Sequence, residues 1–289
     1  MRSRHALSLS FLLLLAACAT APQQPPAAQV AARWLQQVTA ISAGDDTAAR
    51  GAAITDRLRA LGLPAQQQAF QSGALAGHNL VADLGGPVGA PLLLIGAHYD
   101  RVDVGRGATD NASGAAAVLE LAAALRKRPL RNVRVKVAFW DLEERGLLGS
   151  RAWIAAPAQE RPALYVNFDV FGWGDTLWLM TPQADGPLAA ATRDAAGANG
   201  LPLRAGAEYP PTDHRAFLDA GLPAVSFSLL GAAEIDPTLQ VYAGQKLAQL
   251  PKVAQVIHSD RDRVAELDAT AVPLALRTIE AALRTWDAR

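Results

Sequence analysis

Histidine and acidic side chains in this sequence stand directly after short apolar runs, at the positions where buried strands would end. Residues 91–95 form one such run and residues 133–139 form another. Polar side chains just beyond a strand end point into the crevice where open α/β sheets hold their ligands. The polar residues that end these runs or begin an alanine-rich stretch are His98, Asp100, Asp110, Glu143 and Glu144. So many carboxylates in one crevice indicate a metal site.

Five residues at the ends of separate elements carry the nitrogen and carboxylate donors that zinc binds. They are His98, Asp110, Glu144, Asp169 and His258. Five ligands are more than one tetrahedral zinc uses, but they suit two metals about 3.5–4 Å apart that share a bridging carboxylate and a bridging water. Such a pair lowers the pKa of the water and polarises a scissile carbonyl. The sequence therefore predicts two zinc ions as cofactors, and cobalt or manganese also fits a nitrogen and oxygen site.

Hydrolysis at such a site needs a further carboxylate, which takes a proton from the water and passes it to the leaving amine. The adjacent Glu143 and Glu144 could supply both functions, one as the base and the other as a ligand. Asp100 stands two residues after His98, where it could accept the other N–H of that imidazole and fix its tautomer.

Six motifs together resemble the co-catalytic zinc aminopeptidases, a family that includes bacterial leucyl aminopeptidases. The motifs extend in family order over the region from about residue 79 to the C-terminus. They are His98-Tyr99-Asp100, Thr109-Asp110-Asn111-Ala112-Ser113-Gly114, Glu143-Glu144-Arg145-Gly146-Leu147-Leu148-Gly149-Ser150, Asn167-Phe168-Asp169, Thr212-Asp213-His214 and Ile257-His258-Ser259.

The resemblance implies a function for each of these acidic and histidine residues. It implies Asp110 as the bridging ligand and Glu143 as the general base. The remaining ligands divide between the two metals, His98 with Asp169 on one zinc and Glu144 with His258 on the other. The implied activity is metal-dependent exopeptidase hydrolysis of N-terminal residues, with peptides that have a free N-terminus as substrates.

One position departs from the family pattern. Some members carry a tyrosine beside the last histidine, where it helps to stabilise the tetrahedral oxyanion, but this chain has Ile257 there. Tyr209 or Tyr242 could supply the hydroxyl instead.

Four further residues are predicted to contact the substrate. Asp213 and His214 belong to one of the matching motifs, and Trp140 and Trp173 flank the acidic motifs. The alternative for the first pair is a helix cap followed by a surface histidine. The alternative for the tryptophans is a place in the core.

Other functions are compatible with parts of the same pattern. A glutaminyl cyclase resembles the same fold but uses one zinc, and the complete five-ligand set favours the peptidase. A non-catalytic binding module, as in relatives that have lost ligands, is disfavoured because Glu143 and all five ligands are present. Carboxypeptidase or dipeptidase action stays open, because the metals do not select which peptide terminus is held.

The elements that must position these residues alternate between strands and helices. Helices are expected over residues 30–41, 46–61, 110–125, 186–198, 214–220 and 264–286, and strands over residues 66–71, 79–84, 91–95, 133–139, 164–168, 177–180 and 224–229. This alternation predicts an α/β fold with a mixed, largely parallel β-sheet sandwiched between helices. The chain shows no internal repeat, so we expect a single zinc peptidase domain over residues 30–289.

The N-terminus has the pattern of an export signal. Arg2 and Arg4 precede an apolar run that is too short to span a bilayer comfortably. Leu15-Ala16-Ala17-Cys18 resembles the lipobox of bacterial lipoproteins, which implies a signal peptide over residues 1–17 and a lipid anchor to the membrane at Cys18. Residues 18–29 are predicted to form a flexible tether. The residue after the cysteine is Ala19 and not aspartate, which resembles lipoproteins that are sorted to the outer membrane. We therefore expect a lipoprotein facing the periplasm, with a soluble secreted or periplasmic protein as the alternative.

Charge and cysteine content narrow the function classes further. The 289 residues carry 27 Lys and Arg against 27 Asp and Glu, and no basic stripe stands out. Nucleic acid is therefore not expected as a partner. Cys18 is the single cysteine, which excludes an intramolecular disulfide.

Overall fold

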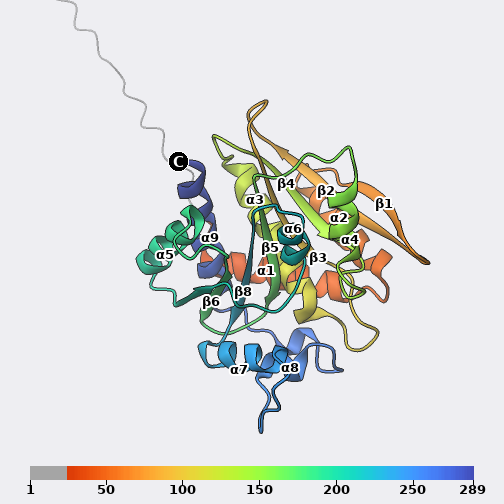
Figure 1. Cartoon of the computed structure of the whole chain (residues 1–289), viewed down its shortest axis with the longest axis vertical. Coiled ribbons are helices and arrows are strands. Elements are labelled where there is room, and N and C mark those ends of the chain that lie inside the picture. The colour runs from red at the N-terminus through yellow and green to blue at the C-terminus, as the bar shows by residue number, and fades with distance from the viewer. Residues whose placement is uncertain (1–24) are drawn as a thin grey trace, which may run out of the picture.

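The computed structural model describes residues 25–289. Its centre is an eight-stranded sheet (Figure 1). The strands are β1 (Gln66–Ser72), β2 (Leu75–Gly85), β3 (Leu92–His98), β4 (Arg134–Trp140), β5 (Leu164–Phe171), β6 (Thr176–Met180), β7 (Leu203–Gly206) and β8 (Ala224–Leu230). Their order across the sheet is β1-β2-β4-β3-β5-β8-β6-β7. The central strands β4, β3, β5 and β8 are parallel, whereas β2 and β6 join them antiparallel, so the predicted mixed, largely parallel sheet is confirmed.

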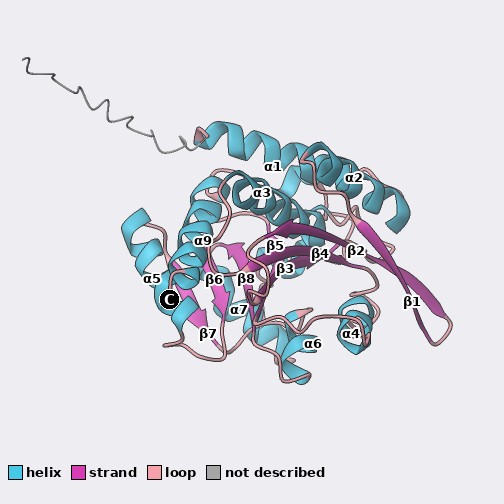
Figure 2. Cartoon of the chain, turned by 90° about the horizontal axis from the view of Figure 1, so that it is seen from above, coloured by secondary structure: helices cyan, strands magenta, loops and turns pink. Residues whose placement is uncertain are grey.

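Helices cover both faces of this sheet. The helices are α1 (Ala27–Ser42), α2 (Thr47–Ala60), α3 (Ser113–Lys127), α4 (Leu148–Ala155), α5 (Pro187–Asn199), α6 (His214–Asp219), α7 (Ala232–Tyr242), α8 (Lys252–Val256) and α9 (Val272–Asp287). Figure 2 shows α1, α2, α3 and α9 on one side of the sheet and α4 and α6 on the other. Within residues 25–289, no helix is long and apolar enough to cross a membrane.

Strands β3 and β8 are buried along their whole length because both faces of the sheet are covered there. In β3, Leu93 and Ile95 belong to the core under α1, α3 and α9, whereas Leu94 belongs to a second core on the opposite face. This alternation follows the two-residue period of a strand. The polar side chains at the end of β3 are therefore fixed by apolar packing on both sides.

Several expected boundaries differ from the structure. The helix expected over residues 264–286 begins only at Val272, after a 3₁₀ turn at Val264–Glu266. The carboxylate of Asp268 accepts hydrogen bonds from both the backbone N–H and the hydroxyl of Thr270, which stabilises a turn between the two segments. Helices α4, α7 and α8 and strand β7 have no counterpart among the expected elements.

The N-terminal predictions fall mostly outside the described residues. The signal peptide over residues 1–17, the lipidation site Cys18 and most of the tether lie there. Residues 27–29, expected in the tether, instead form the start of α1 directly after Pro26. Farther along, the Asp46 carboxylate caps the start of α2 by accepting the backbone N–H of Ala49 at 2.8 Å.

Candidate metal centre

Parallel strands bring the predicted ligands to one edge of the sheet. β3 ends at His98, and Asp169 lies near the end of β5. The turn after β4 carries Glu143 and Glu144. Asp110 reaches the same edge from a kinked turn (Ala108–Ala112) directly before α3, in which Asp110 and Asn111 have non-helical backbone angles. The carboxyl ends of neighbouring parallel strands are where open α/β sheets bind their ligands.

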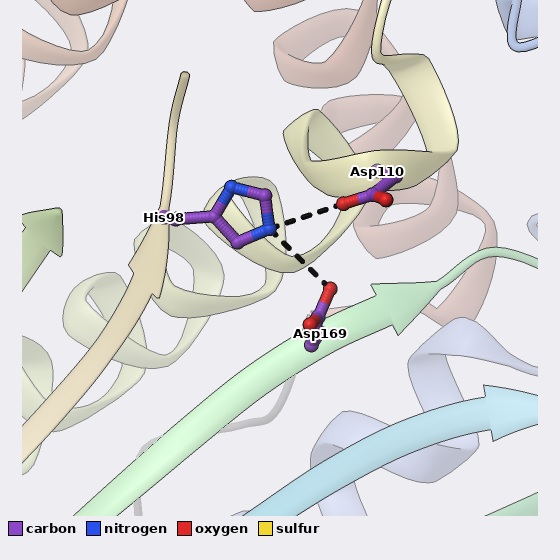
Figure 3. Close-up of side chains that lie close together, drawn as sticks. All are labelled: His98, Asp110 and Asp169. Atoms are coloured by element: carbon purple, nitrogen blue, oxygen red, sulfur yellow. Dashed lines mark ion pairs between the residues drawn. The ribbon is translucent and has the colours of Figure 1, made fainter. Parts of the chain in front are cut away.

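His98, Asp110 and Asp169 form the first group of predicted ligands (Figure 3). The Nε2 atom of His98 lies 3.0 Å from Asp110 Oδ1 and 3.6 Å from Asp169 Oδ1. The other ring nitrogen of His98, Nδ1, lies 3.3 Å from Asp100 Oδ1. The predicted contact between Asp100 and this imidazole is therefore confirmed, and it directs Nε2 toward the other two carboxylates.

Asp110, Glu144 and His258 form the second group. The Nε2 atom of His258 lies 3.2 Å from Asp110 Oδ2 and 3.1 Å from Glu144 Oε2. Asp110 thus presents one carboxylate oxygen to each group. The His258 side chain is 50% exposed whereas that of His98 is 1% exposed, so the site opens to solvent on the His258 side.

The charges in the two groups are strongly coupled to one another. Burial alone would raise the pKa of Asp110, but the imidazoles of His258 and His98 outweigh it and hold this pKa below its ordinary value. Burial and the charge of Asp110 raise the pKa of Glu144. The carboxylates of Asp110 and Glu144 accept hydrogen bonds from His258 and raise its pKa to about 10. A divalent cation between the carboxylates at this edge would therefore stabilise their charged forms.

The residues after Asp110 fix the turn that carries it. The side chain of Asn111 donates from Nδ2 to the backbone oxygen of Phe168 at 2.9 Å, and its Oδ1 accepts the backbone N–H of Gly114 at 3.0 Å. The Ser113 hydroxyl donates to the backbone oxygen of Thr109 at 2.6 Å. A Cβ atom at Gly114 would overlap with Asn111 Oδ1, so only glycine fits this close approach.

Backbone conformations that are unfavourable for side-chain-bearing residues lie next to the ligands. His258 has φ +57°, Val170 has φ +52° and Leu142 has φ +56°. This left-handed region is especially unfavourable for a β-branched residue such as Val170. Val170 follows a predicted ligand and Leu142 precedes Glu143, so the strained backbone gathers at the candidate site, as is common at functional sites.

Asp100 also fixes the turn that carries the two glutamates. Its Oδ1 accepts the backbone N–H of Glu143 at 3.1 Å and its Oδ2 accepts that of Glu144 at 3.2 Å. One buried carboxylate thereby connects the end of β3 to the turn after β4. Burial raises the pKa of Glu143 well above its ordinary value, with His98 opposing the shift and neighbouring carboxylates adding to it.

Two buried carboxylate oxygens of these groups have no hydrogen-bond partner among residues 25–289. They are Asp169 Oδ1 and Glu144 Oε1. A buried acceptor that stays unpaired costs free energy unless another group satisfies it. In each group, the nitrogen and oxygen donors lie within 4.8 Å of one another. The residues present therefore fit zinc, which takes such donors.

Asp213 and His214 lie inside the molecule. Asp213 is fully buried and makes no side-chain cap, and His214 is 4% exposed, so the alternative of a cap followed by a surface histidine is wrong. Burial raises the pKa of Asp213 to about 7 and lowers that of His214 to about 3. The charge of Asp213 also raises the pKa of Glu143, which places Asp213 near the predicted base. Contact of either residue with substrate stays a prediction.

The two tryptophans that were predicted to contact substrate belong to the core. Trp140 is 0% exposed, and its Nε1 donates to the Tyr165 hydroxyl at 2.7 Å. Trp173 is 4% exposed and donates from Nε1 to Glu234 at 2.7 Å. The prediction that they wall the substrate pocket is therefore wrong, because neither ring presents enough surface to a substrate.

The two tyrosines considered in place of Ile257 have different surroundings. The Tyr209 hydroxyl is hydrogen-bonded to Ser228, whose hydroxyl in turn donates to the backbone oxygen of Asp169. Tyr242 is 50% exposed, yet burial of its hydroxyl and the charges of Asp110 and Asp169 raise its pKa. Tyr242 therefore presents its hydroxyl within electrostatic range of both ligand groups.

Two residues that support the site were not predicted from the sequence. The Asp262 carboxylate accepts the backbone N–H groups of Thr109 at 2.6 Å and Asp110 at 3.2 Å. Arg50 is fully buried and donates to backbone oxygens near the site. The position of Asp262 four residues after His258 was a weak sequence signal that it lies near the site. No such sequence signal exists for Arg50, because an arginine on an amphipathic helix usually faces solvent.

Comparisons with known proteins identify relatives of the whole region that carries these motifs. The family model described as peptidase family M28 matches residues 79–283. Leupeptin-inactivating enzyme 1 of Streptomyces exfoliatus is 32% identical over 222 residues, which are 72% of this chain and 50% of that protein. A probable lipoprotein aminopeptidase of Mycobacterium tuberculosis is 40% identical over 111 residues, which are 37% of this chain and 21% of that protein. The chain thus spans about half the length, or less, of these curated relatives.

Solved structures share the fold. A zinc aminopeptidase from Bacillus subtilis superposes with a TM-score of 0.58 at 21% identity, covering 73% of this chain and 50% of that one. Glutaminyl cyclase from Porphyromonas gingivalis superposes with a TM-score of 0.69 at 21% identity, covering 91% of this chain and 98% of that one. At this level of identity, both similarities establish the sheet between two helical layers and no more.

Proposed function

The chain belongs to peptidase family M28, and from this premise we propose that it is a zinc-dependent aminopeptidase that acts on peptides with a free N-terminus. The observation that carries the proposal is the position of Asp110, whose two carboxylate oxygens lie 3.0 Å from His98 and 3.2 Å from His258. A carboxylate shared in this way between two groups of ligands is the arrangement that a two-metal hydrolase requires.

In this proposal His98 and Asp169 would hold one zinc, Glu144 and His258 would hold the other, and Asp110 would contribute a carboxylate oxygen to each. Zinc bound by these residues would lower the pKa of a bound water toward about 7 and would polarise the scissile carbonyl. Asp100 supports the arrangement by keeping Nδ1 of His98 occupied, so that Nε2 stays available.

Glu143 acts as the general base in the proposed reaction. It takes a proton from the water as the water oxygen bonds to the carbonyl carbon, and it delivers that proton to the amine nitrogen as the C–N bond breaks. Its position supports this role, because the backbone N–H bonds to Asp100 hold its turn against the ligand groups. The surrounding carboxylates also favour the positively charged amine of a free peptide N-terminus.

The proposal is tested with leucine- and alanine-anilides, which release a coloured amine on hydrolysis. We expect the full chain to hydrolyse both, to lose the activity on chelation and to recover it with added zinc. The matched control is the N-acetylated leucine-anilide, which lacks the charged amine and should be hydrolysed far more slowly. Equal rates on the free and acetylated substrates would exclude an aminopeptidase, and hydrolysis that a chelator leaves unchanged would exclude a metal mechanism.

A single-zinc glutaminyl cyclase is the second candidate, because the cyclase structure covers nearly the whole of this chain. The presence of His98 and Asp169 beside Asp110, in addition to the Glu144 and His258 group, favours the peptidase. One zinc per chain, together with cyclisation of an N-terminal glutamine and no anilide hydrolysis, would establish the cyclase instead.

We also propose that the protein is exported and anchored to the membrane through lipid on Cys18, in the outer membrane and facing the periplasm. The lipobox-like segment Leu15-Ala16-Ala17-Cys18 supports the anchor. One relative is itself described as a probable lipoprotein aminopeptidase, which is consistent with this location.

A further inference from the structure

Arg50 is a fully buried arginine on α2, close beneath the candidate site. Its three guanidinium nitrogens each donate to a different backbone oxygen. Nε donates to Tyr99 at 2.5 Å, Nη1 donates to Arg106 at 2.9 Å and Nη2 donates to Gly107 at 3.1 Å. Few side chains can satisfy three carbonyls at once, and the planar guanidinium fork of arginine suits this task.

These three carbonyls belong to the two segments that carry His98 and Asp110, two of the three predicted ligands of the first group. Tyr99 stands between His98 and Asp100 at the end of β3. Arg106 and Gly107 lie at the end of the loop that leads into the turn with Asp110. One guanidinium therefore sets the distance between the end of β3 and the loop that carries the shared carboxylate.

The same loop is attached to the first two helices by a second arginine. Arg106 donates from Nε to the backbone oxygen of Ser42 at 3.0 Å and from Nη2 to that of Ala43 at 2.5 Å. Its Nη1 also contacts Asp45 Oδ1 at 2.9 Å. The end of α1 and the connection to α2 thus hold the loop from outside, while Arg50 holds it from inside. Both helices precede residues 79–283, the part that matches the family model.

The electrostatics explain how this buried cation is tolerated. Burial lowers the pKa of Arg50 to about 10, so the guanidinium keeps its charge at neutral pH. The charges of Asp100, Asp262 and Asp110 oppose that shift, which places Arg50 within the field of the acidic site. Burying a charge is costly unless nearby groups compensate for it, and the carbonyls and carboxylates here do so.

We propose that Arg50 is a positioning residue for the metal centre, which aligns Asp110 with His98 by bridging the loop and the end of β3, with Arg106 completing the attachment to α1 and α2. The proposal rests on the metal site of the proposed function. It assigns a role at the site to helices that precede the matched region.

The test compares the zinc affinity of the wild-type full chain with that of the Arg50→Lys variant, measured by competition with a chromophoric chelator. Arg50→Lys keeps the charge, but one ammonium group cannot reach three separated carbonyls. We expect this variant to bind zinc roughly 10–100-fold more weakly, the range seen when outer contacts of metal ligands are removed. Far-UV circular dichroism and the Tm of the metal-free protein report whether the variant is folded.

Arg33→Gln is the matched control. Arg33 contacts the buried Glu120 at 2.7 Å and connects α1 to α3 away from the ligands. Its loss should lower the Tm while leaving zinc affinity within about twofold of wild type, because distant sites act independently. An unchanged affinity in Arg50→Lys would overturn the proposal. An equal loss of affinity in Arg33→Gln would also overturn it, because the effect would then reflect general stability.

If Arg50→Lys does not fold, Arg106→Gln tests the same proposal. The Arg106 side chain is 30% exposed, so its replacement should leave the core intact. Weaker zinc binding in Arg106→Gln would support the attachment to α1 and α2, and unchanged binding would refute it. A wild-type chain that binds no zinc would overturn the proposed function as well. Wild-type zinc binding without anilide hydrolysis would contradict only the aminopeptidase activity and leave the Arg50 comparison valid.

Discussion

His98 is held between two carboxylates, with Asp100 at Nδ1 and Asp110 at Nε2. The first contact orients the ring, and the second connects it to the other ligand group. The Asp100 carboxylate also accepts hydrogen bonds from the backbone N–H groups of Glu143 and Glu144. Orientation of His98, a proposed ligand, and placement of Glu143, the proposed base, therefore depend on the same side chain.

Replacing Glu143 with glutamine tests its assignment as the general base. The amide is close in size to the carboxylate but cannot take a proton from water. We expect anilide hydrolysis to fall by about 10²–10⁴-fold, the usual contribution of a general base. Zinc content should stay at the wild-type level, because Glu143 is not a proposed ligand. Retention of wild-type activity would show that another group takes the proton.

Tyr242→Phe tests whether this tyrosine donates a hydrogen bond to the developing oxyanion. Some family members use for this a tyrosine at the position of Ile257. We expect a lower kcat with little change in KM, because a donor to the oxyanion acts mainly in the transition state. Loss of one such donor typically costs about 10²–10³-fold in kcat. Tyr209→Phe is the comparison, because the hydroxyl of Tyr209 is already bonded to Ser228. A larger loss in Tyr209→Phe would assign the donor to that residue instead.

At the scale of elements, the close approach of α3 to the end of β5 explains the motif that follows Asp110. Asn111 bonds both the backbone oxygen of Phe168 and the backbone N–H of Gly114. The Ser113 hydroxyl also accepts the backbone N–H of Phe171 at 2.9 Å. The start of the helix is thereby fixed to the strand that carries Asp169, and the two ligands are fixed with it.

Gly114→Ala should destabilise the protein, because the new Cβ would overlap with Asn111 Oδ1 and lie 2.7 Å from the backbone oxygen of Phe168. We expect a loss of about 1–3 kcal/mol, as for other overpacked sites. Gly197→Ala in α5 is the control, because nothing lies within 4 Å of its Cβ position. Alanine there should raise stability by about 0.5–1 kcal/mol. Denaturant unfolding measures both, and an equal response would contradict this explanation of Gly114.

The sequence predicted which acidic and histidine side chains gather at the sheet edge, because their positions follow from regular elements. A buried strand ends where its apolar run ends, so the apolar runs alone are enough to assign His98 and Asp169 to one edge of the sheet. The boundary of α9 was wrong because the turn around Asp268 depends on local hydrogen bonds. Arg50 was missed because its partners are backbone oxygens, 49 or more residues away, that no side-chain pattern reveals.

In the molecule as a whole, the first two helices are hydrogen-bonded to the loop at the sheet edge. Arg50 and Arg106 connect α1 and α2 to the loops at the end of the sheet. The opening of the site lies on the side of His258, whose side chain is 50% exposed. Peptides would therefore enter on that side, while the deeper His98 group stays enclosed.

Cys18→Ser tests the proposed anchor. Serine cannot accept the thioether-linked lipid, so we expect the variant to lose metabolic labelling by palmitate and to leave the membrane fraction. More than one acyl chain is needed for stable membrane attachment, which is why loss of the modified residue should release the protein. The measurement is membrane fractionation of cells that express the full chain. Wild-type protein found free of lipid and soluble in the periplasm would instead support the alternative of an ordinary signal peptide.

In the proposed site Asp110 joins two metal positions, and the zinc content per chain tests this arrangement. Elemental analysis should give about two zinc ions per wild-type chain and about one in each of His98→Ala and His258→Ala, because each variant loses a ligand of one position only. Circular dichroism of the variants confirms that they are folded. One zinc per wild-type chain, retained in His98→Ala and lost in His258→Ala, would contradict the claim and leave a single metal at the Glu144 group.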